Sequence, residues 1–227
     1  AARARGAGPA VIYLALPPPV FAAAITAIGQ AGLPADSAIV IEKPFGHDLK
    51  SAQELNALLA KAAPERAIHR IDHFLEKQTV QNILGVRFAN RVFEPLWNHH
   101  HVERVELVWD ENLALEGRAG YYDRAGALRD MIQNHLLQVM ALVAMERPRT
   151  LDEQDLRDRK VEVLKAIRTP TPEDIATQTI HARYTAGTSV NGPVPDYTSE
   201  PGIDGSRGTE TFAAAVPYTQ LTLPTTH

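Results

Sequence analysis

The chain contains no cysteine among its 227 residues. This excludes disulfide bonds, zinc sites built on cysteine and catalysis by a thiolate. The sequence also lacks an excess of positive charge, because 23 Lys and Arg residues stand against 27 Asp and Glu residues and the formal net charge is −4. A chain with this charge offers no basic surface, so we expect neither nucleic acid nor a membrane as a partner.

Long apolar runs are missing as well. The longest run, near the N-terminus, is interrupted by Pro17, Pro18 and Pro19, and it is too short to span a bilayer. The first residues contain two arginines but no signal-type apolar segment with a cleavage site. These features and the absence of cysteine lead us to expect a cytoplasmic protein. The length suffices for one large or two small domains with a real core.

The first third of the chain alternates between strand-like and helical patterns. Strands are predicted over residues 11–16, 38–41 and 67–71, with helices over residues 20–31 and after Asp48. This alternation predicts parallel strands joined by right-handed crossovers, as in part of a doubly wound sheet. The apolar run over residues 11–16 predicts a strand that is buried on both faces.

Three polar or turn-forming groups follow the predicted strand ends. They are Pro17, Lys43 and the segment 72–77, and the carboxyl ends of parallel strands meet at the edge of the sheet where ligands bind. If a helix begins near Asp72, His73 and Lys77 share a face at its N-terminus, which favours a phosphate. Taken alone, such a pair of acid and histidine is more often a surface pair or a helix cap.

The rest of the chain predicts a different architecture. Residues 102–109 alternate as in an antiparallel strand with one exposed face, residues 125–146 form the strongest helical pattern, and further strands are expected over residues 179–184 and 209–216. The run His99 to His101 is more typical of a loop than of a metal site, and we expect no bound metal.

His135 lies in the middle of the long apolar helix, where a histidine is usually a core residue. Asp130 precedes it by five positions, so the two side chains are not expected to share a helix face, and any joint role would involve a ligand. The fold class predicted from these patterns is α/β plus α+β, with a Rossmann-like parallel sheet followed by an incomplete, mainly antiparallel domain. The predicted domains are residues 1–79 and 80–215, with a tail of unclear origin over residues 216–227.

Six motifs occur in a specific order and spacing: YLALPP at 13–18, EKPFG at 42–46, RIDHFLEK at 70–77, RFAN at 87–90, EGR at 116–118 and QNHLLQ at 133–138. With these motifs the chain resembles the glucose-6-phosphate dehydrogenase family from about residue 11 to about residue 213. A single motif such as Glu-Lys-Pro is weak, because other sugar oxidoreductases use it, whereas six in register are highly specific.

The resemblance implies an oxidoreductase that oxidises D-glucose 6-phosphate at C1 to 6-phosphogluconolactone, with hydride transfer to NADP. This is the first step of the pentose phosphate pathway, and members of the family form dimers or tetramers. An imidazole suits the general base, because it changes charge near neutral pH. The resemblance implies that His135 is the general base and that Asp72 is its carboxylate partner. It implies that His73 and Lys77 bind the phosphate, and that Glu116 and Asp130 bind the sugar. Lys43, which precedes a cis Pro44, would contact both sugar and cofactor, and Pro17 and Phe21 would contact the cofactor.

The sequence departs from the family pattern in three places. First, Phe74 replaces a tyrosine, and Phe21 stands where the family often has a tyrosine. Second, no glycine-rich strand–turn–helix precedes Val11. Third, the family continues beyond the end of this chain. We therefore expect an internal fragment of the enzyme that binds the cofactor poorly and turns over slowly or not at all.

Two alternatives stay open at this point. One is another sugar oxidoreductase that shares the Glu-Lys-Pro turn and acts on an unphosphorylated sugar or inositol. The other is a non-catalytic module that binds sugar phosphates or forms dimers. The choice between NADP and NAD also stays open, because the residues that read the 2′-phosphate lie in the region before the first strand.

Overall fold

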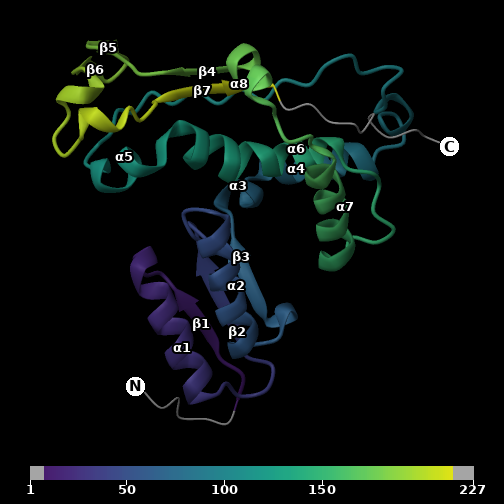
Figure 1. Ribbon diagram of the computed structural model, residues 1–227. Helices are drawn as coiled ribbons and strands as arrows, with labels where there is room; N and C mark the ends of the chain where they lie inside the picture. Colours follow the sequence, from purple (N-terminus) through teal and green to yellow (C-terminus); the bar gives the residue numbers. More distant parts are fainter. Residues whose placement is uncertain (1–7, 217–227) are drawn as a thin grey trace. The chain divides into compact units, whose positions relative to one another are not determined.

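The computed structural model describes residues 8–216 and divides the chain into two compact units, Ala1–His73 and Phe74–His227 (Figure 1). The boundary lies a few residues before the predicted domain boundary at residue 79. The predicted tail begins with Val216, and its remaining residues, 217–227, lie outside the described residues.

The first unit is built on a three-stranded parallel sheet. Its strands follow the order β1 (Val11–Leu14), β2 (Ala38–Glu42) and β3 (Ile68–Ile71). In the ladder, Leu14 lies opposite Ile41 and Glu42 lies opposite Ile71. This confirms the predicted parallel arrangement, and it places the carboxyl ends of the three strands along one edge of the sheet.

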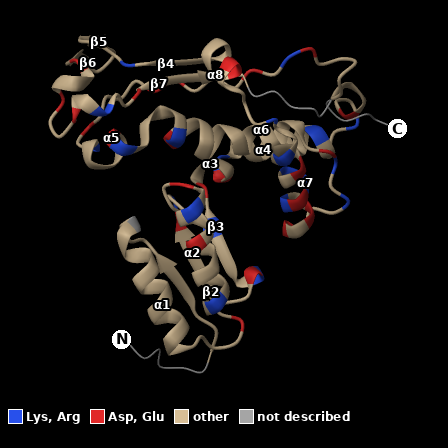
Figure 2. Cartoon of the chain, in the orientation of Figure 1, with Lys and Arg blue, Asp and Glu red and all other residues tan. Residues whose placement is uncertain are grey.

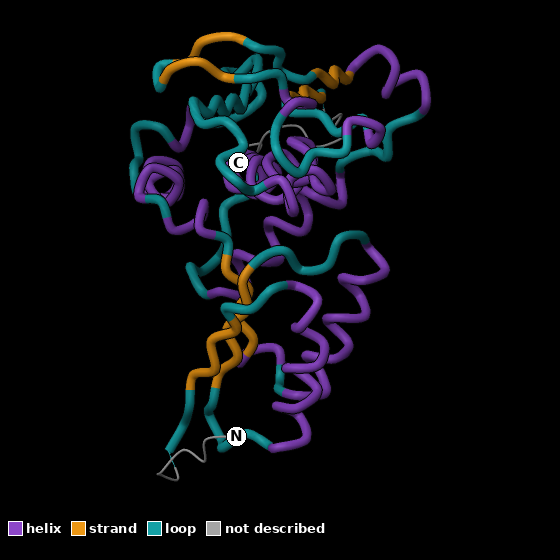
Figure 3. The backbone as a smooth tube through the Cα atoms, turned by 90° about the vertical axis from the view of Figure 1, so that its left-hand side faces the viewer, coloured by secondary structure: helices purple, strands orange, loops and turns teal. Residues whose placement is uncertain are grey.

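Two helices connect these strands. A short 3-10 turn, η1 (Pro18–Val20), leads into α1 (Phe21–Ala31), while α2 (Leu49–Ala62) and the turn η2 (Glu65–Ala67) join β2 to β3. The expected cap of α2 is present, because the Asp48 carboxylate accepts a hydrogen bond from the Ser51 amide at 2.7 Å. Figure 3 shows both helices on the same side of the strands.

The core of the first unit fills the space between this sheet face and the helices. Its buried members are Leu14, Phe21, Ile25, Ile39, Ile41, Leu55, Leu59, Ala63 and Ile68. The prediction that β1 is buried on both faces is wrong, since Val11 is 73% exposed and Tyr13 is 50% exposed. In the described part of the chain the helices cover one face only, and alternate residues of a strand point to opposite faces.

The second unit is mainly helical and carries two small antiparallel sheets. Its elements are α3 (His73–Glu76), which begins at the unit boundary, α4 (Gln78–Phe88), η3 (Glu94–Leu96), α5 (Ala119–Ala127), η4 (Leu128–Leu136), α6 (Leu137–Ala144), α7 (Glu153–Ala166), α8 (Pro172–Gln178), β4 (Thr179–Ala182), β5 (Gly187–Ser189), β6 (Gly192–Val194), η5 (Tyr197–Ser199), η6 (Gly205–Arg207) and β7 (Phe212–Ala215). Strand β4 pairs with β7, and β5 pairs with β6.

Two clusters hold this unit together. One lies among α4, α6 and α7 and includes Val80, Ala141 and Val163, and the other surrounds Tyr197. Figure 2 shows acidic and basic residues interspersed along α7. Among the described residues, no helix has the length and apolar character that a membrane crossing needs.

The expected strand over residues 102–109 does not form, and this segment is irregular. A strand needs a neighbour that takes its backbone N–H and C=O groups. Within residues 8–216 no strand pairs with this segment, so its alternating pattern has no ladder to join.

The helix predicted to start near Asp72 is broken at Lys77, whose backbone is extended (φ −63°, ψ 129°) between α3 and α4. His73 and Lys77 therefore lie on separate helical segments. The prediction that they share one helix face is wrong, and Lys77 instead stands at the N-terminal end of α4.

The long helix predicted over residues 125–146 has three parts. It starts after a non-helical Gly126 (φ 70°, ψ 170°) in α5, continues as the π-helix η4, and ends as α6. A π-helix closes i→i+5 hydrogen bonds, so its turn is wider than that of an α-helix. The prediction that Asp130 and His135 do not share a helix face stays a prediction.

Candidate active site

A buried ion pair lies at the carboxyl edge of the parallel sheet. Lys43 follows β2 and Asp72 follows β3, and the Lys43 ammonium lies 3.3 Å from the Asp72 carboxylate, with the side chains only 15% and 8% exposed. The Lys43–Pro44 peptide bond is cis, as expected. The edge that the sequence singled out therefore carries an acid and an ammonium held together in a largely dry environment.

The other predicted residues of the first unit differ in their surroundings. Pro17 is exposed just after β1, and His73 is exposed where the chain enters α3. Phe21 is only 2% exposed and belongs to the core beneath the sheet. Its ring therefore offers almost no exposed surface, and the cofactor contact of Phe21 stays a prediction.

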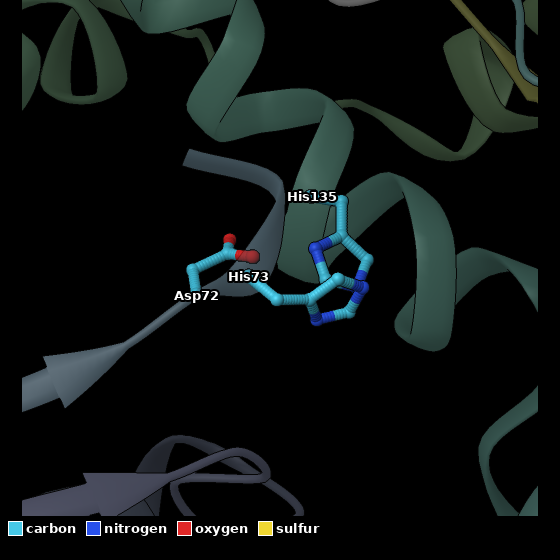
Figure 4. Close-up of side chains that lie close together, drawn as sticks. All are labelled: Asp72, His73 and His135. Atoms are coloured by element: carbon cyan, nitrogen blue, oxygen red, sulfur yellow. The ribbon is translucent and has the colours of Figure 1, made fainter. Parts of the chain in front are cut away.

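The predicted base, His135, lies in η4 in the second unit and is 4% exposed. Its imidazole stacks on the ring of Phe74, with 3.9 Å between centroids and 23° between planes. Figure 4 shows His135 projecting from its helix, and it shows Asp72 and His73 following β3. The aromatic stack fixes the orientation of the imidazole ring.

Lys77 occupies a notch between two aromatic rings. Its ammonium nitrogen lies 4.2 Å from the ring centroid of Phe74 and 4.2 Å from that of Trp109. The two rings are themselves in contact, with centroids 4.7 Å apart. A cation on the face of an aromatic ring is attracted by the negative charge of that face. The two rings therefore fix the position of Lys77, which is expected to bind the phosphate.

The two carboxylates expected to bind sugar hydroxyls have different settings. Asp130 accepts a hydrogen bond of 3.0 Å from the hydroxyl of Tyr121. Burial, followed by the nearby Asp130 carboxylate, raises the pKa of Tyr121 above its usual value, so Tyr121 remains a neutral donor. Glu116 is exposed in a turn with φ 47°, and the structure gives it no comparable support.

The start of the π-helix is held from a distant part of the sequence. The side-chain carboxylate of Glu210 accepts a hydrogen bond of 2.9 Å from the Leu128 amide. The backbone carbonyl of Glu210 accepts one of 3.2 Å from the Ala127 amide. A Cβ atom at Gly126 would lie 2.5 Å from the same carboxylate. The segment before β7 thus anchors the helix that carries Asp130 and His135.

Sequence reasoning missed Trp109, Tyr121 and Glu210. The pattern around Trp109 predicts a strand, and no sequence signal points to a contact with Lys77. Tyr121 lies nine positions before Asp130, a separation that suggests no pairing until the bend at Gly126 is known. Glu210 lies 82 positions from its partner amide, so only the folded chain reveals the contact.

Two family models match this chain. The model for the NAD binding domain of glucose-6-phosphate dehydrogenase matches residues 2–82, and the model for the C-terminal domain of glucose-6-phosphate dehydrogenase matches residues 84–220. The second match extends into the segment that the resemblance left out.

Curated relatives include the glucose-6-phosphate 1-dehydrogenases of Rhizobium meliloti and Bacillus subtilis. The first is 46% identical over 89% of this chain and 41% of the relative, and the second is 44% identical over 90% and 42%. The chain thus spans about two-fifths of the length of these relatives.

Solved structures agree with the sequence matches. A glucose-6-phosphate dehydrogenase in complex with its substrate glucose-6-phosphate has a TM-score of 0.82 and 38% identity, with 93% of this chain and 43% of the other covered. The enzyme from Mycobacterium avium has a TM-score of 0.81 and 37% identity, with 94% and 45% covered. Since the family model for the C-terminal domain alone matches more than half of the sequence, the chain belongs to the glucose-6-phosphate dehydrogenase family.

Proposed function

We propose that this chain contributes the substrate-binding and proton-transfer residues of a glucose-6-phosphate dehydrogenase. In this reaction the C1 hydroxyl of D-glucose 6-phosphate loses a proton and the C1 carbon loses a hydride, so the product is 6-phosphogluconolactone. NADP supplies the acceptor for the hydride when it is bound. The residues of this chain bind and orient the sugar phosphate and move the proton.

His135 is proposed as the general base that removes the proton from the C1 hydroxyl. Its imidazole is buried and held by the stack on Phe74, so it does not have to be ordered during the reaction. Asp72 is proposed to accept a hydrogen bond from the second ring nitrogen and to stabilise the imidazolium that forms.

Chain continuity supports the pairing of these two side chains. Only His73 separates Asp72 from Phe74 in the sequence, and Phe74 stacks on His135. Asp72 also forms an ion pair with Lys43, which fixes the position of the carboxylate. The single observation that carries the proposal is the stack of His135 on Phe74, a residue that lies two positions after Asp72 in the sequence.

The substrate phosphate is proposed to bind to His73 and Lys77. His73 is exposed, and the Lys77 ammonium is already positioned between two rings. A compact ammonium and an imidazole both donate hydrogen bonds to phosphate oxygens. Asp130, oriented by the hydroxyl of Tyr121, is proposed to accept hydrogen bonds from sugar hydroxyls together with Glu116.

The residues at the sheet edge fit a nicotinamide dinucleotide. Such cofactors lie across the carboxyl ends of parallel strands, and this edge offers the exposed Pro17 after β1 and the ammonium of Lys43 after the cis peptide. Lys43 is therefore proposed to contact both the cofactor and the sugar. Phe21 is left out of this set, because it is a core residue.

The test is to titrate the purified chain with glucose 6-phosphate by calorimetry, and to follow nicotinamide reduction when NADP⁺ is added. We expect binding of glucose 6-phosphate with slow turnover, and binding of glucose at least tenfold weaker, because glucose lacks the phosphate that carries most of the charge. Equal affinity for glucose and glucose 6-phosphate would favour an oxidoreductase of unphosphorylated sugars.

We also propose that the protein self-associates. The small β4–β7 sheet leaves Ile180 and Phe212 60% and 49% exposed, and an apolar sheet face of this kind favours burial against another chain. Light scattering at increasing concentrations tests this proposal, with a dimer or tetramer as the expected result and a monomer at all concentrations as the contrary one.

A further inference from the structure

We propose that Trp109 is a positioning residue for phosphate recognition, and that it acts by holding the ammonium of Lys77 against Phe74. This inference rests on the proposed function, because it assigns a role toward the phosphate of the same substrate. The two residues involved are Phe74, which stands where the family has a tyrosine, and Trp109, for which no role is predicted from the sequence.

The geometry of the notch is specific. The Lys77 nitrogen lies at the same distance, 4.2 Å, from the centroids of Phe74 and Trp109, and the ring planes are inclined by 59°. Phe74 is 4% exposed and is itself fixed by its stack on His135. The indole N–H of Trp109 donates to the Glu111 carboxylate at 3.2 Å, which orients the second ring.

An aromatic face can hold an ammonium group and leave its N–H donors able to form hydrogen bonds with another group. The attraction of a cation to an aromatic face is electrostatic and uses none of the three N–H donors. The two inclined rings contact the Lys77 ammonium with their faces, and its N–H donors are proposed to bind the anion. Lysine otherwise loses a large rotamer entropy when it is ordered, and here part of that loss occurs on folding and not on binding of the substrate.

The position of Lys77 between the two rings also compensates for the hydrogen-bond donor that is missing at Phe74. Phe74 lacks the hydroxyl that a tyrosine would direct at the phosphate, so more of the recognition depends on the cations. A lysine held in place by Trp109 meets the phosphate with less reorganisation, which favours binding.

The test compares the affinity of the unmodified chain with that of Trp109→Leu for glucose 6-phosphate, inorganic phosphate and glucose. Removing the ring is expected to weaken binding of glucose 6-phosphate and phosphate by about two- to fivefold, the range typical of a partly exposed cation–π contact. Binding of glucose is expected to stay unchanged. Trp109→Phe keeps an aromatic face, and it should restore most of the affinity.

Matched controls separate this role from a structural one. Val108→Ala changes the neighbouring residue, which is 74% exposed, and it is expected to leave all three affinities as they are. In a Lys77→Met background, Trp109→Leu should have no further effect, because the two residues act as a unit.

Three results would overturn the inference. Identical affinity of Trp109→Leu and the unmodified chain would show that the ring does not position Lys77, and tighter phosphate binding would show that the notch competes with the phosphate. Equal weakening for glucose would show a general structural role. Failure of the unmodified chain to prefer glucose 6-phosphate over glucose would instead refute the proposed function, and the inference would fall with it.

Discussion

At the scale of single residues, the exchange of tyrosine for phenylalanine at position 74 is the clearest feature of this chain. Its ring contacts His135 and Lys77 at once, so it links the proposed base to the proposed phosphate ligand. The phenyl ring makes both contacts without a hydroxyl, and the absent hydroxyl removes one donor from the proposed surroundings of the phosphate.

Restoring that hydroxyl gives the first prediction. Phe74→Tyr is expected to tighten binding of glucose 6-phosphate by about three- to tenfold, because a hydrogen bond to a charged group contributes about 1 kcal/mol or more. Calorimetry measures the effect, and the matched control is Phe93→Tyr at a residue that is 43% exposed. Weaker binding in Phe74→Tyr would indicate that the added hydroxyl disturbs the stack on His135.

The residues of the candidate site differ in how far the sequence predicts them. The cluster around Asp72 and the ion-pair partner Lys43 could be predicted, because both follow parallel strands and the sheet edge brings them together. The contact of Lys77 with two aromatic rings could not be predicted, because one ring is Trp109, which lies in a segment whose pattern predicts a strand. The burial of Phe21 could not be predicted either, because its place in the core follows from the packing of α1 on the sheet.

At the scale of elements, a buried arginine of α4 holds the C-terminal end of α6. The Arg87 side chain in α4 is 3% exposed and donates to the carbonyls of Leu142 and Met145 at 2.6 Å each. Burial lowers its pKa to about 10, so the guanidinium stays charged at neutral pH. It satisfies carbonyls at the end of α6 that have no partner within the helix.

Removing this cap is expected to destabilise the second unit. Arg87→Met leaves two buried carbonyls without their donors, which lowers the free energy of unfolding by about 2–4 kcal/mol. Arg87→Lys is expected to recover only part, since an ammonium does not reproduce the fork of the guanidinium. Urea denaturation measures the loss. Arg91→Met, at an exposed residue, is the control and should change the midpoint little.

The kink before η4 offers a second prediction for this element. Gly126→Ala forces a side chain into a positive φ and places its Cβ against the Glu210 carboxylate, so we expect a loss of about 1–3 kcal/mol. Gly85→Ala lies in α4 with open space around it and should stabilise by about 0.5–1 kcal/mol. Thermal unfolding followed by circular dichroism distinguishes them, and equal effects at the two glycines would contradict this account of the kink.

Local patterns predicted some elements and missed others for identifiable reasons. The alternation in the first unit predicted the parallel sheet and its helices, because apolar periodicity and caps such as Asp48 agree there. Helix α8 was not predicted, although Thr171 and Asp174 form a capping box with Pro172 at the first turn. The π-helix begins at Leu128, whose amide donates to the distant Glu210 carboxylate, and no local sequence pattern predicts this start.

At the scale of the whole molecule, the residues proposed for the site belong to two separately built units. The first unit holds the ion pair of Lys43 and Asp72, and the second unit holds the stacked His135. The chain passes from one to the other within His73 and Phe74, so the proposed carboxylate and the ring that supports the base belong to one short segment.

The most direct test of this account is the turnover of the active enzyme after His135→Asn, measured beside its affinity for glucose 6-phosphate. We predict that kcat falls by about a hundredfold to ten-thousandfold, the usual contribution of a general base, while the affinity changes by less than about threefold. The control His181→Asn, on the exposed strand β4, should retain full activity. A kcat for His135→Asn within about tenfold of the unmodified enzyme would contradict the account, because His135 would then be only a core residue.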